Sequence, residues 1–304
     1  IEFQDGYFWV GRKRISKLRF LWRSEWNEKF FEYFESQRAA SVAKLKLESV
    51  KQFSELQSDQ AFLGFTGDGQ LVSDFVRDGA HLLIIGPTGS GKSKLLQVIC
   101  GSILASTTAQ QSMFAFIDYK GGATFDRIRG DRIKFSVSDL RPEEIAVALA
   151  QLADEIARRE QLLAKHGAAS ILDLRAMGIQ VPTLYTICDE FASLVRSSKS
   201  AAVVFEELLS KGRSLGLIVI LASQSLAGIP RSMLVNIRQK IALAGVDAVD
   251  LHLLGFSRSV ETEKTQLESG IHANWIGASA QSVRFIFPAD FALEKTLVNR
   301  HFSA

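Results

Sequence analysis

The stretch that decides the fold is Gly86-Pro-Thr-Gly-Ser-Gly-Lys-Ser93, which follows the apolar run Leu82–Ile85 and precedes a helical pattern over Ser93–Ala105. It fits the spacing G-x-x-x-x-G-K-[ST] in the strand–loop–helix context that this motif requires. Its glycines allow a backbone whose successive N–H groups point at one anion, and the start of a helix adds its dipole at the same point. The sequence therefore predicts a loop that holds the phosphates of a nucleotide.

Within such a loop the lysine and the residue after it have different tasks. Lys92 is expected to reach the β- and γ-phosphates, and the Ser93 hydroxyl is expected to be a ligand of Mg²⁺. The residues of the loop and of the first helical turn that we expect to bind the nucleotide are Gly86, Thr88, Gly89, Ser90, Gly91, Lys92, Ser93 and Lys94.

A second apolar run, Leu184–Cys188, ends in the acidic pair Asp189-Glu190. The phosphate-binding loop Gly86–Ser93 is a P-loop, and the run Leu82–Ile85 before it is the P-loop strand. An acid at the end of a strand beside the P-loop strand is placed to bind Mg²⁺, usually through water. A carboxylate one residue further on points elsewhere and can polarise the attacking water. We therefore expect Asp189 to hold the metal together with Ser93, and Glu190 to act as the general base.

The third element is the run Leu217–Leu221, followed by Ala222-Ser223-Gln224. A polar residue that leaves a buried strand next to the P-loop strand can hydrogen-bond the γ-phosphate or the lytic water. We expect Gln224 to take this part and to sense hydrolysis. The three elements together predict Mg²⁺-dependent hydrolysis of a nucleoside triphosphate.

Around these motifs, short apolar runs alternate with helical stretches. Continuous apolar strands between helices indicate an α/β domain with a mostly parallel central sheet that is covered on both faces. The expected fold is a RecA-like P-loop domain over residues 61–304, and the segment Gly64–Gly69 reads as a turn. The runs that we expect to be strands are Leu82–Ile85, Met113–Ile117, Ile133–Val137, Leu184–Cys188, Leu217–Leu221, Ile241–Ala244 and Val283–Phe287.

Residues 1–60 differ in character and are expected to form a helical N-terminal extension. Residues 1–23 carry six basic side chains against two acidic ones, interleaved with aromatic residues, so that the rest of this +3 chain is close to neutral. Such a leader suits an anionic membrane interface, or an edge that docks on the following domain. From about residue 25 to 60 the polar, breaker-poor sequence predicts a helical stalk. Because the chain begins with Ile1 instead of Met, we expect residues to precede it.

The composition, with 47% hydrophobic and 23% charged residues among 304, is that of a globular protein and excludes a disordered or collagen-like chain. Cys100 and Cys188 lie far apart within apolar runs and no C-x-x-C pair occurs, so structural zinc is not expected and a reducing compartment is. No stretch is long and apolar enough to be a transmembrane helix.

The order and spacing of these motifs resemble the FtsK/SpoIIIE family of hexameric motor ATPases (HerA/FtsK-type P-loop NTPases). The resemblance extends over about residues 62–290 and includes Asp118-Tyr-Lys-Gly-Gly-Ala-Thr-Phe125 and Gly212-Arg-Ser-Leu-Gly-Leu217. These forms are most similar to the type VII secretion ATPases called EccC or EssC. The resemblance implies ATP as the nucleotide. The sequence departs from the family pattern at Gly270–Trp275, where a glycine-rich turn is expected.

The resemblance also implies partners. It implies self-association in a hexameric ring, a membrane component upstream of the chain, and a place at the cytoplasmic face of a bacterial membrane. The cargo is a protein secretion substrate or, alternatively, double-stranded DNA. Family hexamers commonly need an arginine from a neighbouring subunit, and Arg213 and Arg158 are the candidates. The mixed-charge run Asp126–Lys134 either lines a channel that contacts phosphates or is a solvated face.

Overall fold

The computed structural model describes residues 2–4, 7–10, 13–15, 56–57, 59–66, 69–122, 124–125, 130–256, 270–279 and 281–288. The chain divides into two compact units, Ile1–Leu47 and Glu48–Ala304. Among the described residues, no helix is both long enough and apolar enough to cross a membrane.

The described residues of the first unit form strands. β1 (Glu2–Gln4), β2 (Tyr7–Val10) and β3 (Lys13–Ile15) make a three-stranded antiparallel sheet. The register places Phe8 opposite both Phe3 and Ile15. Where we expected a helical extension, the described residues of this leader are therefore β-structure; aromatic and β-branched residues favour strands. Most of the expected stalk lies outside the described residues.

The second unit is built on one sheet of ten described strands in the order β5-β4-β13-β12-β11-β6-β10-β9-β7-β8. The six strands from β11 to β8 are parallel, whereas β5, β4, β13 and β12 add an antiparallel extension. This confirms the mostly parallel sheet. Its strands are β4 (Gln60–Thr66), β5 (Gly69–Asp74), β6 (Leu82–Ile85), β7 (Ser112–Asp118), β8 (Ile133–Ser138), β9 (Thr183–Asp189), β10 (Leu217–Ser223), β11 (Gln239–Leu243), β12 (Gly270–Ile276) and β13 (Ser282–Pro288).

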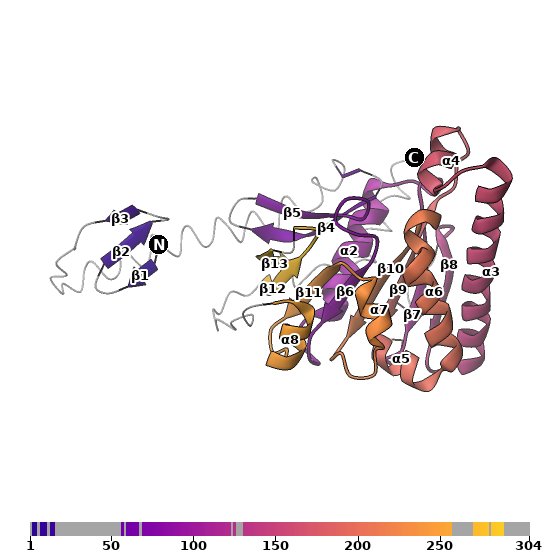
Figure 1. Ribbon diagram of the computed structural model, residues 1–304. Helices are drawn as coiled ribbons and strands as arrows, with labels where there is room; N and C mark the ends of the chain where they lie inside the picture. The colour runs from indigo at the N-terminus through magenta and orange to yellow at the C-terminus, as the bar shows by residue number, and fades with distance from the viewer. Residues whose placement is uncertain are drawn as a thin grey trace. The chain divides into compact units, whose positions relative to one another are not determined.

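Helices cover both faces of this sheet (Figure 1). Alternate residues of the P-loop strand β6 belong to different cores: Leu83 and Ile85 pack with α3, α5 and α6, whereas Leu82 and Ile84 pack with α2. The apolar runs of β6, β9 and β10 are thus buried on both sides, as expected of parallel strands in the middle of a sheet. The helices are α2 (Lys92–Ser106), α3 (Pro142–His166), α4 (Ile171–Ala176), α5 (Phe191–Ser197), α6 (Lys199–Leu215), α7 (Arg231–Val235) and α8 (Ala248–Leu254).

The segment expected as a turn, Gly64–Gly69, includes the end of β4 and the start of β5, which pair antiparallel with Thr66 opposite Gly69, so that the chain reverses within it. Gly64 lies at a register shift of the β4–β5 pair. A Cβ added there would lie 2.3 Å from the carbonyl oxygen of Ile286 on β13. Gly64 itself therefore permits a close approach of two strands, which the sequence pattern does not distinguish from a part in the reversal.

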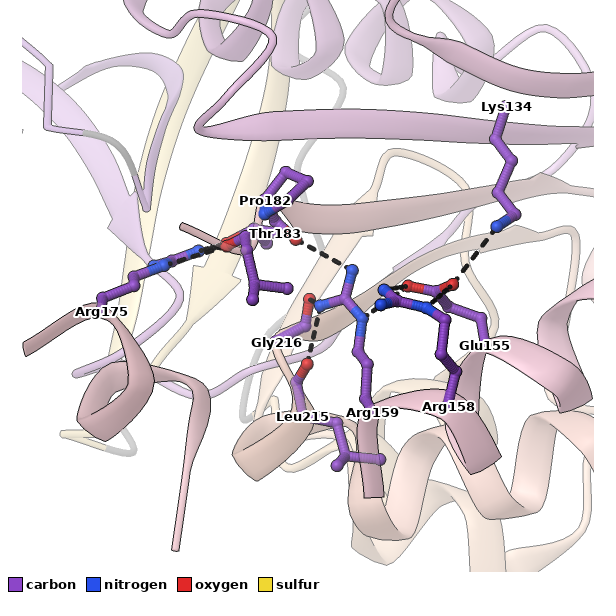
Figure 2. Close-up of polar contacts among 10 residues, drawn as sticks. Lys134, Glu155, Arg158, Arg159, Arg175, Pro182, Thr183, Leu215 and Gly216 are labelled. Carbon is purple, nitrogen blue, oxygen red and sulfur yellow. Dashed lines mark hydrogen bonds and ion pairs between the residues drawn. The ribbon is translucent and has the colours of Figure 1, made fainter. Parts of the chain in front are cut away.

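A buried arginine fixes the amino-terminal ends of the central strands (Figure 2). Arg159 of α3 is 2% exposed and donates to the carbonyls of Leu215 (2.7 Å), Gly216 (3.1 Å) and Pro182 (2.9 Å), just before β10 and β9 begin. It also donates to Glu155 at 2.7 Å. One side chain thus donates to three carbonyls at the starts of β9 and β10, and ties α3 to both strands.

Candidate nucleotide-binding site

The loop 86–91 joins β6 to α2 at the carboxyl edge of the parallel strands, where ligands of open α/β sheets bind. Two of its glycines are required by the geometry. A Cβ on Gly86 would lie 2.8 Å from Cβ of Leu243, and Gly91 precedes α2 with φ of 103°. No side chain caps α2 and no acid occupies its first turn. The N–H groups and the dipole of this helix start are therefore available to an anion.

Lys92 is buried inside this loop, with 3% of its surface exposed. Its Nζ donates to the carbonyls of Gly86 and Pro87, the latter at 3.0 Å. Burial lowers the pKa of Lys92, whereas the negative charges of Glu190 and Asp189 act to raise it. The ammonium thus lies where the loop would enclose a phosphate, beside two carboxylates.

The two expected metal-binding residues meet. The Ser93 hydroxyl donates to Oδ2 of Asp189 at 2.7 Å, and Asp189 is fully buried at the end of β9. One part of our expectation is wrong: β9 is not next to the P-loop strand, because β10 lies between β6 and β9. The loop therefore extends past β10, so that Ser93 at the start of α2 contacts Asp189.

Glu190 shows two features of a functional side chain. Its Oε2 is buried without a hydrogen-bond partner. Its φ of 62° is the one positive value for a non-glycine residue in the described part of the chain. A left-handed non-glycine residue and an unpaired buried carboxylate oxygen are both costly, and such strain concentrates at active sites.

Gln224 follows β10 directly, and β10 is next to β6, as expected. The carbonyl of Ser223 accepts from the N–H of Gly86 at 3.1 Å, so Gln224 leaves the sheet beside the first residue of the P-loop. Its side chain is exposed.

The remaining predicted loop residues lie at different depths. Thr88 and Gly89 form an exposed tip, and Lys94 is exposed on the first turn of α2. Ser90 has a buried hydroxyl without a hydrogen-bond partner. The structure thus brings the predicted loop, the acidic pair and Gln224 to one edge of the sheet.

Arg213 is not part of this group. It lies near the end of α6, just before β10 begins, and therefore at the amino-terminal edge of the parallel strands, opposite the P-loop. It is exposed, with a 3.5 Å contact from Nη2 to the carbonyl of Val76. It also lines a cavity of about 370 Å³ at that edge. Within one chain it cannot act on the bound nucleotide.

The alternative arginine and the basic run are engaged elsewhere. Arg158 pairs with Glu155 through two hydrogen bonds of 2.7 and 3.0 Å (Figure 2). Lys134 also pairs with Glu155, and Arg132 donates to the carbonyls of Leu104 and Thr107. Residues 126–129 of the same run lie outside the described residues.

Two residues to which the sequence assigned no role in the site, Thr124 and Asp118, adjoin Asp189. The Thr124 hydroxyl donates to Oδ2 of Asp189 at 3.0 Å, and the Thr124 N–H donates to Asp118 at 2.7 Å. Burial raises the pKa of Asp118, and the charge of Asp189 adds to this effect. The available signal was the motif Asp118–Phe125 itself, which places a hydroxyl six residues after an acid at a strand end.

A glycine-rich loop between strand and helix, with a serine–aspartate contact and a second acid at the same edge, defines a P-loop nucleoside triphosphatase. The chain belongs to the FtsK/SpoIIIE family of P-loop ATPases, whose family model matches residues 50–282. The resemblance drawn from the motifs is thereby confirmed.

Curated relatives of the chain include proteins of secretion systems. The chain is 34% identical over 180 residues to the ESX-4 secretion system protein EccC4 of Mycobacterium tuberculosis, a match that covers 54% of this chain and 15% of that protein. It is 32% identical over 204 residues to the type VII secretion system protein EssC of Staphylococcus aureus, covering 62% and 14%. The chain therefore spans a small part of these relatives' length.

Two solved structures share the fold of this chain. The cytoplasmic domain of the type VII secretion ATPase EccC of Thermomonospora curvata matches with a TM-score of 0.70 and 26% identity, over 84% of this chain and 32% of that one. The pCW3 conjugation coupling protein TcpA, solved with ATPγS, matches with a TM-score of 0.61 and 21% identity, over 82% and 72%. The second likeness concerns the fold alone.

Proposed function

We propose that this domain binds and hydrolyses ATP with Mg²⁺ and acts as a motor in a type VII-like secretion system. The observation that carries the hydrolytic part is the convergence of Ser93 and Asp189 at 2.7 Å beside a buried, unpaired oxygen of Glu190. A hydroxyl and carboxylates are the oxygen ligands that Mg²⁺ prefers, and Mg²⁺ commonly takes one or two of them together with substrate phosphates. The residues therefore fit the ion.

Each residue has a task in this proposal. The loop 86–91 and the start of α2 bind the phosphates, and the ammonium of Lys92 neutralises charge on the γ-phosphoryl group. Ser93 and Asp189 would hold Mg²⁺, which when bound would offset the negative charge that develops on the phosphates. Oε2 of Glu190 accepts a hydrogen bond from the lytic water and then its proton. Gln224 reports the state of the γ-phosphate from the end of β10.

The secretion role rests on the relatives. The curated proteins named above belong to secretion systems. A solved structure of ATPases 2 and 3 of T. curvata EccC contains a signal sequence peptide in complex with that protein. We infer that the cargo is a protein substrate, that the domain works in a hexameric ring, and that it acts at the cytoplasmic face of a bacterial membrane beside a membrane component. The near-neutral charge outside the leader also favours a protein over a polyanion.

The second candidate is a DNA translocase. The likeness in fold to a conjugation coupling protein supports it. A motor that tracks phosphates depends on Lys and Arg contacts and loses them as salt rises.

The experiment that tests the proposal is ATP turnover of the purified chain over a range of protein concentration, with and without double-stranded DNA, at low and moderate salt. We expect Mg²⁺-dependent turnover that is indifferent to DNA and rises in specific activity with concentration. Lys92→Ala should abolish it, while Lys165→Ala, an exposed lysine at the end of α3, should not. Turnover that DNA stimulates several-fold at low salt but not at moderate salt would favour the translocase. Normal turnover by Lys92→Ala would refute the phosphate site.

A further inference from the structure

Two hydroxyls from different loops converge on one oxygen of the acid that ends β9. Ser93 of the P-loop and Thr124 of the loop after β7 both donate to Oδ2 of Asp189, at 2.7 and 3.0 Å. The other oxygen, Oδ1, accepts the backbone N–H of Glu190 at 3.0 Å. Both carboxylate oxygens of Asp189 are thus held by donors, and Thr124 supplies the one side-chain donor that does not belong to the P-loop among the described residues.

Thr124 is itself held in place by a second acid. Asp118, at the end of β7 and 2% exposed, accepts the N–H of Thr124 at 2.7 Å on one oxygen and the N–H of Lys120 at 3.1 Å on the other. The register of β7 and β9 places Asp118 directly opposite Asp189. The side chain of Asp118 therefore folds the turn that returns Thr124 to the neighbouring strand end.

The same turn is attached at two further points. The N–H of Tyr119 donates to the carbonyl of Asp189 at 3.1 Å. The hydroxyl of Tyr119 lies 2.6 Å from Oγ of Ser197 at the end of α5. On the opposite face, the ring of Phe125 stacks on that of Phe116 with centroids 4.6 Å apart. Tyr119 before Thr124 and Phe125 directly after it are thus each held by contacts, which limits the positions that the Thr124 hydroxyl can take.

We propose that Thr124 is a positioning residue for the metal-binding carboxylate, and that Asp118 positions Thr124. The hydroxyl of Thr124 sets the rotation of the Asp189 carboxylate independently of the P-loop, so the acid is oriented for the ion before nucleotide arrives. Partners that orient a ligating carboxylate typically change metal affinity by about 10- to 100-fold when they are lost. This inference rests on the proposed role of Ser93 and Asp189 as Mg²⁺ ligands.

The test is the affinity of the full chain for a fluorescent, non-hydrolysable ATP analogue, measured in excess Mg²⁺ and again in EDTA. Thr124→Val keeps the shape of the side chain but removes the hydroxyl. We expect Thr124→Val to bind the analogue like wild type in EDTA. In Mg²⁺, its affinity for the analogue should be about tenfold lower than that of wild type. Thr124→Ser restores the hydroxyl and should restore the Mg²⁺ effect. Thr108→Val, an exposed threonine between α2 and β7, is the matched control and should change neither affinity.

Asp118→Asn provides a second route to the same result. An asparagine offers one acceptor oxygen where two N–H groups need one each, so the turn at Thr124 loosens while Thr124 itself is intact. We expect the same loss of the Mg²⁺ effect, with EDTA affinity retained.

Different failures have different meanings. If wild type gains affinity with Mg²⁺ and Thr124→Val gains as much, the positioning role is wrong while the nucleotide site stands. If Thr124→Ser is as defective as Thr124→Val, the methyl group rather than the hydroxyl matters, and the inference again fails. If wild type binds no nucleotide at all, the proposed function fails together with it.

Discussion

At the scale of single residues, Glu190 adopts a left-handed backbone conformation that non-glycine residues disfavour. A non-glycine residue in the left-handed region costs on the order of 1–3 kcal/mol, and a buried oxygen without a partner costs about as much. Glu190 bears both features beside the loop that holds phosphates. A fold selected for stability alone would place glycine here, so the glutamate indicates a trade of stability for chemistry.

We therefore expect Glu190→Gly to stabilise the domain by about 1 kcal/mol, or roughly 2–4 °C in Tm, while abolishing ATP turnover. Glu190→Gln keeps the strained backbone and the side-chain volume, so it should lose turnover, retain nucleotide binding and gain less stability than Glu190→Gly. Thermal unfolding and turnover of the two variants check this. A Glu190→Gly protein that melts below wild type would show that the left-handed backbone is not strained.

The sequence could predict the residues of this site that are close to one another along the chain. The loop 86–93 and the pair Asp189-Glu190 are short, continuous patterns whose chemistry follows from their residue types. Thr124 could not be placed in this way, because its hydroxyl reaches Asp189 through the pairing of β7 with β9 and the fold of one turn. Long-range pairing of this kind leaves no periodic signal in the chain.

At the scale of elements, the junction of α3 with the starts of β9 and β10 depends on charge. Burial alone would raise the pKa of Glu155, but hydrogen bonds from Arg158 and Arg159 and the charge of Lys134 bring it to about 2. The two arginines differ in exposure: the side chain of Arg159 is 2% exposed and that of Arg158 is 53% exposed. Their contributions to stability should differ accordingly.

We expect Arg159→Lys to destabilise the domain by about 2–4 kcal/mol, because an ammonium cannot replace the fork that bonds Glu155 and three carbonyls. Arg158→Lys, the same exchange one residue earlier, should cost under about 1 kcal/mol because the Arg158 side chain is 53% exposed. Urea unfolding of both variants measures the difference. Equal losses would mean that the carbonyls near Leu215 find other donors.

A second element junction contains a buried histidine. His81, just before β6, is 2% exposed and its Nδ1 accepts the N–H of Val219 on β10 at 3.1 Å. Burial lowers the pKa of His81 to about 4, from an ordinary value near 6.5. The unfolded chain therefore binds this proton first as the pH falls. Stability from the neutral ring is fully present above about pH 6.5 and is lost between pH 6.5 and 4.

We expect this group to remove about 3 kcal/mol of stability over that range. His81→Gln cannot titrate, so its free energy of unfolding should be lower than that of wild type at pH 7.5 but should fall less steeply between pH 6.5 and 4. Urea unfolding of both proteins at several pH values gives the two slopes. Parallel slopes would assign the acid sensitivity to other groups.

Of the described strands in the large sheet, the sequence missed β4, β5 and β12, and for β4 and β5 there is a physical reason. β6, β7, β9 and β10 are buried on both faces and therefore read as unbroken apolar runs. β4 and β5 contain glycine and polar residues, because parts of the pair are exposed and Gly64 must let β13 approach. Strand order is also absent from local sequence, so the position of β10 between β6 and β9 required the structure.

At the scale of the whole molecule, the described groups of the nucleotide site and the candidate arginine lie at opposite edges of one sheet. The P-loop, Asp189 and Glu190 are at the carboxyl edge, and Arg213 is exposed at the amino-terminal edge. An arginine so placed can complete a site only on another copy of the chain. A heterologous contact of this kind, repeated head to tail, closes into a ring when the rotation between copies allows it.

Mixing two inactive variants tests this arrangement directly. Lys92→Ala lacks a working P-loop but retains Arg213, and Arg213→Ala retains the P-loop. If each site takes its arginine from a neighbour, a random equimolar mixture rebuilds about a quarter of the sites, whereas each variant alone stays inactive. ATP turnover above the concentration at which wild type assembles measures the recovery. Arg77→Ala, another exposed arginine at the amino-terminal edge, is the control and should be active without mixing. A mixture no more active than its components would exclude Arg213 as the shared residue.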